Sequence, residues 1–158
     1  MLIRKQRGFT LLELLVVISL IGILSSVGFA SYVNFNRKQI VVQNIQKIIS
    51  DLRLAQSLAL NNQKPVGACG SNTLSGAALV VDGIRSYKVY LVCGGDQLVK
   101  AEELSSSISL APTSWRVEFK VLRQGVVFTP PIQQVLNVSA FGLSKTIFVG
   151  AGGEIKEQ

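Results

Sequence analysis

The stretch that decides the fold is Gly8-Phe9-Thr10-Leu11-Leu12-Glu13, where a short basic segment gives way to a long apolar run. The basic segment contains Arg4, Lys5 and Arg7. Glu13 places one carboxylate near the start of the apolar run, and a charge inside a membrane segment is costly and rare. We therefore take Glu13 as the first candidate functional residue.

The apolar run from Phe9 to Ala30 is about 22 residues long, which is the length of a helix that crosses a bilayer. The cations of residues 1–8 predict that the N-terminus stays cytoplasmic and that the rest of the chain lies outside. Gly22 and Gly28 soften this helix, so part of it could stretch or melt in a filament. An alternative use of the same small residues is close helix–helix contact.

Helical periodicity continues beyond this run, over residues 31–61. Apolar residues recur there at spacings of three and four; they are Val41, Ile45, Ile48, Leu52, Ala55 and Ala59. Asn61-Asn62 is a plausible stop. We expect one helix from about Phe9 to about Leu60, apolar all round in its first half and amphipathic in its second.

After Pro65 the pattern changes to short β-rich runs separated by turn residues. The expected strands are 77–82, 86–93, 97–103, 107–110, 115–122, 126–129, 133–139 and 146–150. Many short strands against one helix indicate the α+β class, with a long N-terminal helix packed on an antiparallel β-sheet head at 62–158.

Composition excludes several classes of site. The 158 residues include no histidine and two cysteines, which removes Ser-His-Asp and Cys-His nucleophiles and four-cysteine zinc sites. We see no phosphate-binding glycine loop and no catalytic constellation, so we expect no enzyme, no cofactor and no metal. The net charge is +7, and without the three cations of residues 1–8 it is +4, a mildly basic value.

Cys69 and Cys93 both fall in the region expected outside the membrane, where oxidising conditions favour pairing. A bridge between them would contribute roughly 3 kcal/mol on the chain-entropy model. The alternative is two small buried apolar residues on adjacent strands, and only geometry separates the two.

A weaker candidate is a basic patch for DNA, formed by Arg116, Lys120 and Arg123 with Lys156. Stacking surfaces for single-stranded DNA could come from aromatic residues; these are Tyr87, Tyr90 and Trp115. The alternative is a solvated strand face beside core aromatics.

Residues 8–18, Gly8-Phe9-Thr10-Leu11-Leu12-Glu13-Leu14-Leu15-Val16-Val17-Ile18, resemble the class III signal and first helix of type IV pilins and type II secretion pseudopilins. The resemblance implies that residues 1–8 are a leader, cleaved between Gly8 and Phe9 by a prepilin peptidase, and that Phe9 is N-methylated. Glu13 could then pair with the Phe9 amine of a neighbouring subunit and set the register. The alternative is a Glu in the first turn that is favourable to the helix dipole.

The remainder resembles the FimT and GspH branch of minor pilins and pseudopilins. The matching segments are Arg53–Ala59, Gly125–Phe128, Phe141-Gly142 and Gly153-Glu154-Ile155. This branch implies a long helix and an all-β head. Its DNA-binding members close on an arginine-rich motif, whereas residues 152–156 contain no arginine.

The sequence therefore predicts a structural subunit, a minor pilin or pseudopilin, of a type IV pilus or type II secretion pseudopilus. The alternative is a DNA-binding minor pilin of a DNA-uptake pilus. Expected partners are other pilin or pseudopilin subunits, prepilin peptidase, the inner-membrane assembly platform and, before assembly, membrane lipid. We expect a single-pass protein of the bacterial inner membrane, with residues 9–30 as its transmembrane and filament-core segment, that moves into a periplasmic or extracellular filament.

Overall fold

A computed structural model describes residues 8–65, 67–123 and 125–158, without the side chains of 26–28, 30 and 123. The chain divides into two compact units, residues 1–38 and residues 39–158. Helix α1 runs from Leu11 to Leu60 and contributes to both units. We describe each unit by itself.

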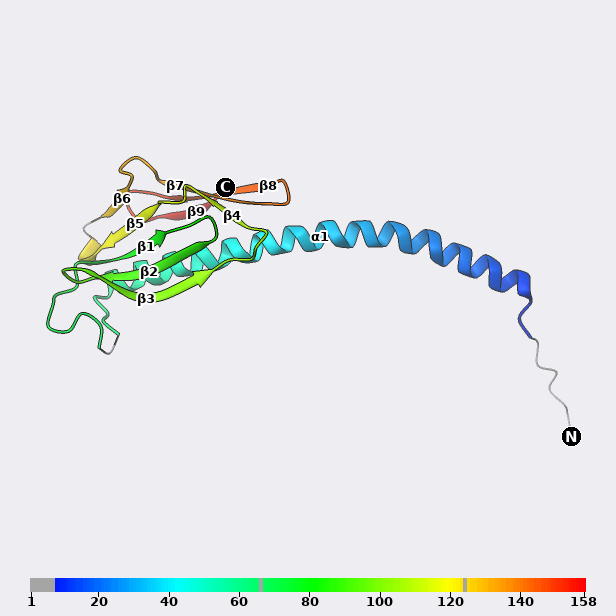
Figure 1. Ribbon diagram of the computed structural model, residues 1–158, viewed down its shortest axis with the longest axis horizontal. Helices are drawn as coiled ribbons and strands as arrows, with labels where there is room; N and C mark the ends of the chain where they lie inside the picture. The colour runs from blue at the N-terminus through cyan, green and yellow to red at the C-terminus, as the bar shows by residue number, and fades with distance from the viewer. Residues whose placement is uncertain (1–7, 66, 124) are drawn as a thin grey trace, which may run out of the picture. The chain divides into compact units, whose positions relative to one another are not determined.

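The described residues of the second unit form a head built from the end of α1 and nine strands in two antiparallel sheets (Figure 1). The first sheet has the order β3-β2-β1-β5-β6. Its strands are β1 (Gly76–Val81), β2 (Ser86–Val92), β3 (Asp96–Glu103), β5 (Arg116–Lys120) and β6 (Val126–Thr129). The second sheet has the order β4-β7-β8-β9. Its strands are β4 (Ser109–Ala111), β7 (Val135–Ala140), β8 (Leu143–Val149) and β9 (Ile155–Glu157), and a 3-10 turn, η1 (Val121–Arg123), follows β5.

One hydrophobic core joins α1 to both sheets. The helix contributes a buried stripe at the three-and-four spacing of an amphipathic helix; it consists of Val41, Ile45, Ile48, Leu52, Ala55 and Ala59. Alternate residues of the strands complete the core, as in β2, where Tyr87, Val89 and Leu91 are buried. Figure 1 shows the last part of α1 running alongside the sheets of the head.

The α+β architecture, the end of the helix at Leu60 and most of the strands agree with expectation. Two differences concern the C-terminal part. β8 begins at Leu143, because Ala140 to Leu143 form a tight hairpin turn rather than a long connection. Residues 155–157 form β9, which pairs with β8 through only three residues. Packing of the helix on the head begins near Val41.

Residues 9–30 were expected to cross a bilayer. Among the described residues, no helix combines the length and the apolar character that a membrane crossing requires.

A disulfide joins Cys69, in the loop after α1, to Cys93 at the end of β2, with a Cα–Cα distance of 5.4 Å. It closes a loop of 24 residues in sequence separation. Such a closure contributes roughly 3 kcal/mol by limiting the unfolded chain. The bridge therefore ties the connection between helix and sheet to the first sheet.

Candidate processing and assembly site

The helix begins with a side-chain cap supplied by Thr10. The Thr10 hydroxyl oxygen accepts a hydrogen bond from the Glu13 backbone N–H at 3.2 Å, and the Thr10 carbonyl accepts one from the Leu14 N–H at 3.2 Å. Threonine is a favoured N-cap because its oxygen satisfies a backbone donor that the first turn leaves unpaired. Helical structure therefore starts just after Phe9.

Gly8 and Phe9 precede this cap in exposed chain outside the helix. A side chain built at Gly8 would meet no atom within 4 Å, and Phe9 is 79% exposed. The bond between them is thus accessible on this chain, and the missing side chain at Gly8 lets another backbone approach closely.

Glu13 lies in the first turn of α1 and is exposed. Within the part of the chain that the structure describes, its carboxylate makes no hydrogen bond or ion pair; the cap uses its backbone N–H alone. A carboxylate here is favourable to the helix dipole, and it remains available to a group from another molecule.

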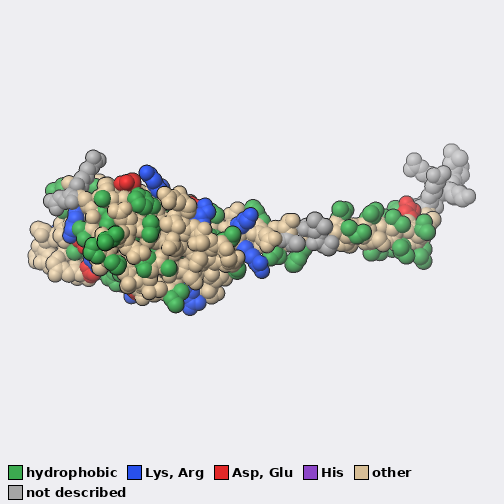
Figure 2. All heavy atoms as spheres, turned by 90° about the horizontal axis from the view of Figure 1, so that it is seen from above, with side chains coloured by type: hydrophobic (Ala, Val, Ile, Leu, Met, Phe, Trp, Pro, Cys, Tyr) green, Lys and Arg blue, Asp and Glu red, His purple; other side chains and the backbone are tan. Residues whose placement is uncertain are grey.

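The first half of α1 is apolar on every side. Its large side chains are between 46% and 84% exposed; they include Leu11, Leu12, Leu14, Leu15, Val16, Val17, Ile18, Leu20, Ile21, Ile23 and Leu24. Figure 2 shows hydrophobic side chains on both sides of this part of the helix. A helix that is hydrophobic all round is normally buried, in a large core or in a membrane.

This geometry coincides with a known processing signal. The N-terminus carries the prokaryotic N-terminal methylation motif. The model of that family matches residues 3–29, which include Gly8, Phe9 and Glu13.

Three relatives extend the similarity beyond the motif. A probable minor fimbrial protein of Dichelobacter nodosus is 35% identical over 85 residues, covering 48% of this chain and 53% of that protein. Prepilin peptidase-dependent protein D of Escherichia coli (strain K12) is 49% identical over 45 residues, covering 28% of this chain and 31% of that protein. Type IV major fimbrial protein FimA of Dichelobacter nodosus is 33% identical over 76 residues, covering 45% of this chain and 48% of that protein.

The chain thus spans about half the length, or less, of these curated relatives. No solved structure shows significant similarity to it. The relatives are fimbrial and prepilin peptidase-dependent proteins by name.

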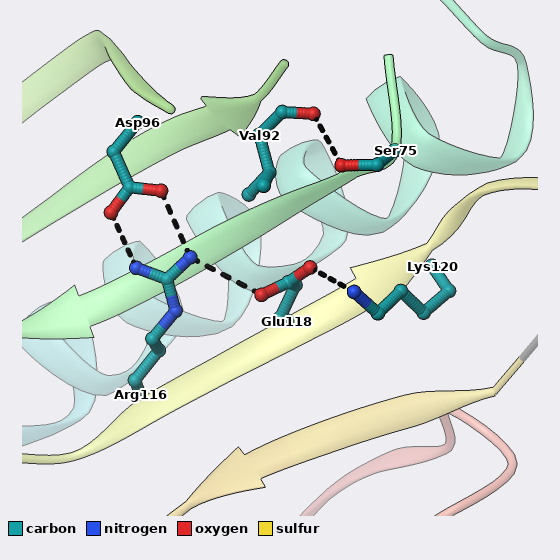
Figure 3. Close-up of polar contacts among 6 residues, drawn as sticks. All are labelled: Ser75, Val92, Asp96, Arg116, Glu118 and Lys120. Carbon is teal, nitrogen blue, oxygen red and sulfur yellow. Dashed lines mark hydrogen bonds and ion pairs between the residues drawn. The ribbon is translucent and has the colours of Figure 1, made fainter. Parts of the chain in front are cut away.

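The basic candidates Arg116 and Lys120 lie on β5, on either side of Glu118 (Figure 3). Arg116 makes a bidentate pair with Asp96 at 2.6 and 3.0 Å and reaches Glu118 at 3.2 Å. Lys120 also donates to Glu118. The Arg116 guanidinium lowers the pKa of Asp96 below its ordinary value, so this pair is ionised at neutral pH. Both cations are therefore engaged by carboxylates.

The remaining candidates for DNA contact do not form a patch with Arg116 and Lys120. Lys156 is exposed on β9, in the other sheet, and the side chain of Arg123 lies outside the described residues. Trp115 and Tyr87 are fully buried, which removes them as stacking surfaces, and Tyr90 is half-buried.

A polar network between helix and sheet escaped the sequence analysis. Asp51 of α1 is 4% exposed and accepts hydrogen bonds from the Tyr87 hydroxyl at 2.7 Å and from Lys100 at 2.8 Å. Glu102 pairs with Lys100 at 3.0 Å and with Lys47 of α1 at 2.6 Å. Burial raises the pKa of Tyr87, and its bond to Asp51 raises it further. The sequence signal that could have revealed this network is Asp51 itself, an acid placed next to the apolar stripe of the helix.

Segments 53–59 and 153–155 meet in the head. Gln56 of α1 donates from its side-chain amide to the carbonyl of Gly153 at 2.8 Å. Gly153 is buried and has a φ of +90°, a conformation that suits glycine. The C-terminal turn is therefore fastened to the helix.

Proposed function

We propose that this chain is a structural subunit of a type IV pilus or a related type II secretion pseudopilus, of the minor pilin or pseudopilin type. Prepilin peptidase would cleave between Gly8 and Phe9, and Phe9 would then be N-methylated. The subunit would wait in the bacterial inner membrane and be assembled by an inner-membrane platform into a filament. The observation that carries the proposal is the exposed apolar half of α1, with Glu13 at its capped start.

Burial of the apolar half of α1 stabilises the subunit both in the membrane and in the filament. Apolar surface gains roughly 25 cal/mol for each Å² removed from water, so the segment is stable in lipid. A bundle of similar helices offers the same surroundings, and the segment can exchange lipid neighbours for helices of other subunits.

Glu13 supplies the register. An unpaired carboxylate in apolar surroundings costs several kcal/mol. Cleavage creates a positive amine at Phe9, and the amine of a neighbouring subunit can meet Glu13 only at one stagger of the two helices. Pairing therefore favours one arrangement over all others.

The test replaces the carboxylate, with Glu13→Ala, and measures processing, membrane retention and incorporation into purified filaments by mass spectrometry. We expect a processed, membrane-retained protein whose incorporation falls at least tenfold. Glu103→Ala is the matched control, because Glu103 is an exposed carboxylate of β3 and its loss should leave incorporation unchanged. Normal incorporation of Glu13→Ala would refute the register role.

A second variant separates register from helix capping. Thr10→Ala removes the cap and costs about 1 kcal/mol of local helix stability, but it keeps the carboxylate. We expect it to incorporate far better than Glu13→Ala. Equal losses in the two variants would show that only the start of the helix matters.

We do not extend the proposal to DNA capture. Arg116 and Lys120, the central residues of that hypothesis, are paired with Asp96 and Glu118.

A further inference from the structure

Residues 32–38 of α1 form a short band of aromatic and basic side chains, which we call the interface band. Tyr32 is 66% exposed and Phe35 is 60% exposed. Arg37 and Lys38 follow after Asn36 and are also exposed. Figure 2 shows basic side chains on α1 where its apolar segment ends.

The band contains the first charged residues after the apolar segment. No charged residue occurs between Glu13 and Arg37. In an anchored helix, Arg37 therefore lies outside the hydrocarbon, because a charged side chain inside it is expensive.

The side chains of the band are those that favour a lipid–water interface. Aromatic rings with one polar end are enriched there, and Lys and Arg extend flexible stems along apolar surface while their heads stay in water. Tyr32 and Phe35 are three residues apart and share one face of the helix. Lys38 is three residues after Phe35 and continues that face, whereas Arg37 lies on the opposite side, so the band carries a cation on each side of the helix.

We propose that the interface band is a binding site for the anionic headgroups of phospholipids. The Arg37 and Lys38 cations meet lipid phosphates, and the rings of Tyr32 and Phe35 lie at the boundary with the acyl chains. The site holds the waiting subunit at one depth. This inference rests on the membrane-anchored state of the proposed function.

Charge complementarity favours this occupant over a second protein. Residues 9–38 contain three charged side chains, Glu13, Arg37 and Lys38. Cleavage after Gly8 would remove the leader cations, so the band would then supply both positive side chains of the unit, beside the new amine at Phe9. Each cation near an anionic surface contributes about 1 kcal/mol, a factor of about five in association. The band would thus hold the processed subunit until it is extracted.

The experiment reconstitutes the full chain in phosphatidylcholine vesicles and compares its association with spin-labelled phosphatidylglycerol and spin-labelled phosphatidylcholine. The wild-type chain should prefer phosphatidylglycerol, and added salt should weaken that preference. Arg37→Gln/Lys38→Gln should lower it by up to about fivefold per cation. The leader is common to all variants, so its contribution cancels.

The matched control is Arg53→Gln/Arg85→Gln, which removes two exposed cations from the head. This control should keep the preference of the wild type. An unchanged preference in Arg37→Gln/Lys38→Gln, or an equal fall in the control, overturns the inference. Loss of filament incorporation by Arg37→Gln/Lys38→Gln with an unchanged lipid preference also overturns it, because the cations would then act between subunits.

Failure of the proposed function gives a different result. If the wild-type chain does not float with vesicles at all, both the anchoring and the lipid site are refuted. If it floats and selects anionic lipid, yet Glu13→Ala assembles normally, the register role fails and the lipid site stands.

Discussion

Asp51 attaches helix α1 to the first sheet through two side-chain partners. It is nearly buried and receives the Tyr87 hydroxyl at 2.7 Å and the Lys100 ammonium at 2.8 Å. Asp51 and Glu102 together raise the pKa of Lys100 above its ordinary value. A buried acid with two donors fixes one rotation of the helix against β2 and β3, because any other rotation leaves a charge without partners.

Replacing this acid with Asp51→Ala should destabilise the head by about 2–4 kcal/mol, because Tyr87 loses its acceptor and Lys100 loses its nearest carboxylate. Thermal unfolding of the full chain in mild detergent, followed by the near-ultraviolet circular dichroism of buried Trp115, would measure the change. Glu103→Gln, at an exposed position, should change stability by less than about 0.5 kcal/mol. A loss in Asp51→Ala no larger than that of the control would show that the network contributes nothing.

At this scale the sequence identifies residues whose role is local. Gly8, Phe9 and Glu13 stand in one short motif, and the structure places them in exposed chain and in the first helical turn. Asp51 could not be assigned in the same way. Its partners lie 36 and 49 residues away, and the pairing depends on how the helix docks on the sheet.

Among the elements, β1 shows how close packing constrains a single position. A side chain built at Gly76 would lie 2.6 Å from the carbonyl oxygen of Phe119 and 3.3 Å from the Glu118 carboxylate. Gly76 pairs with Lys120 across the β1–β5 ladder. The absence of a side chain therefore lets β5 lie close and lets Glu118 occupy the space between Arg116 and Lys120.

Gly76→Ala should force β1 and β5 apart and cost about 1–3 kcal/mol, the usual range for an overpacked position. Gly95→Ala is the matched control, because a side chain there would meet no atom within 4 Å. Melting of both variants in the same detergent would compare them, with a shift of several degrees expected for Gly76→Ala alone. Equal melting temperatures would contradict the close approach of the two strands.

The elements also show where sequence periodicity is informative. The stripe from Val41 to Ala59 predicted the buried face of α1, and β-rich runs bounded by turn residues predicted β2 and β5. β9 was missed because its three residues carry one half-buried apolar side chain, Ile155, and it forms only through pairing with β8. The start of β8 was missed because residues 140–145 were expected to connect two strands. In the structure Leu143, Ser144 and Lys145 belong to β8 but are exposed.

For the whole molecule, the net positive charge does not correspond to a basic surface on the described part of the head. The chain has a net charge of +7, and three of its cations lie in residues 1–8. In the described head, most lysines on the strands pair with acids; these pairs include Lys88–Asp82, Lys100–Asp51, Lys120–Glu118 and Lys145–Glu157. A basic isoelectric point alone therefore indicates little about nucleic-acid binding.

Measurements of DNA binding test directly whether acidic partners neutralise the cations of the head. If Arg116 is held by Asp96, then Arg116→Gln should leave the DNA affinity measured for the full chain unchanged, whereas Asp96→Asn should leave the guanidinium with Glu118 as its remaining acidic partner and strengthen binding. Each additional phosphate that the chain neutralises should steepen the slope of log affinity against log salt by about 0.9. Fluorescence anisotropy with labelled duplex over a salt series would measure this, with Arg53→Gln as a control for general loss of charge. A wild-type slope that falls on Arg116→Gln would show that the cation binds DNA despite its acidic partner, and would restore DNA capture as the leading alternative.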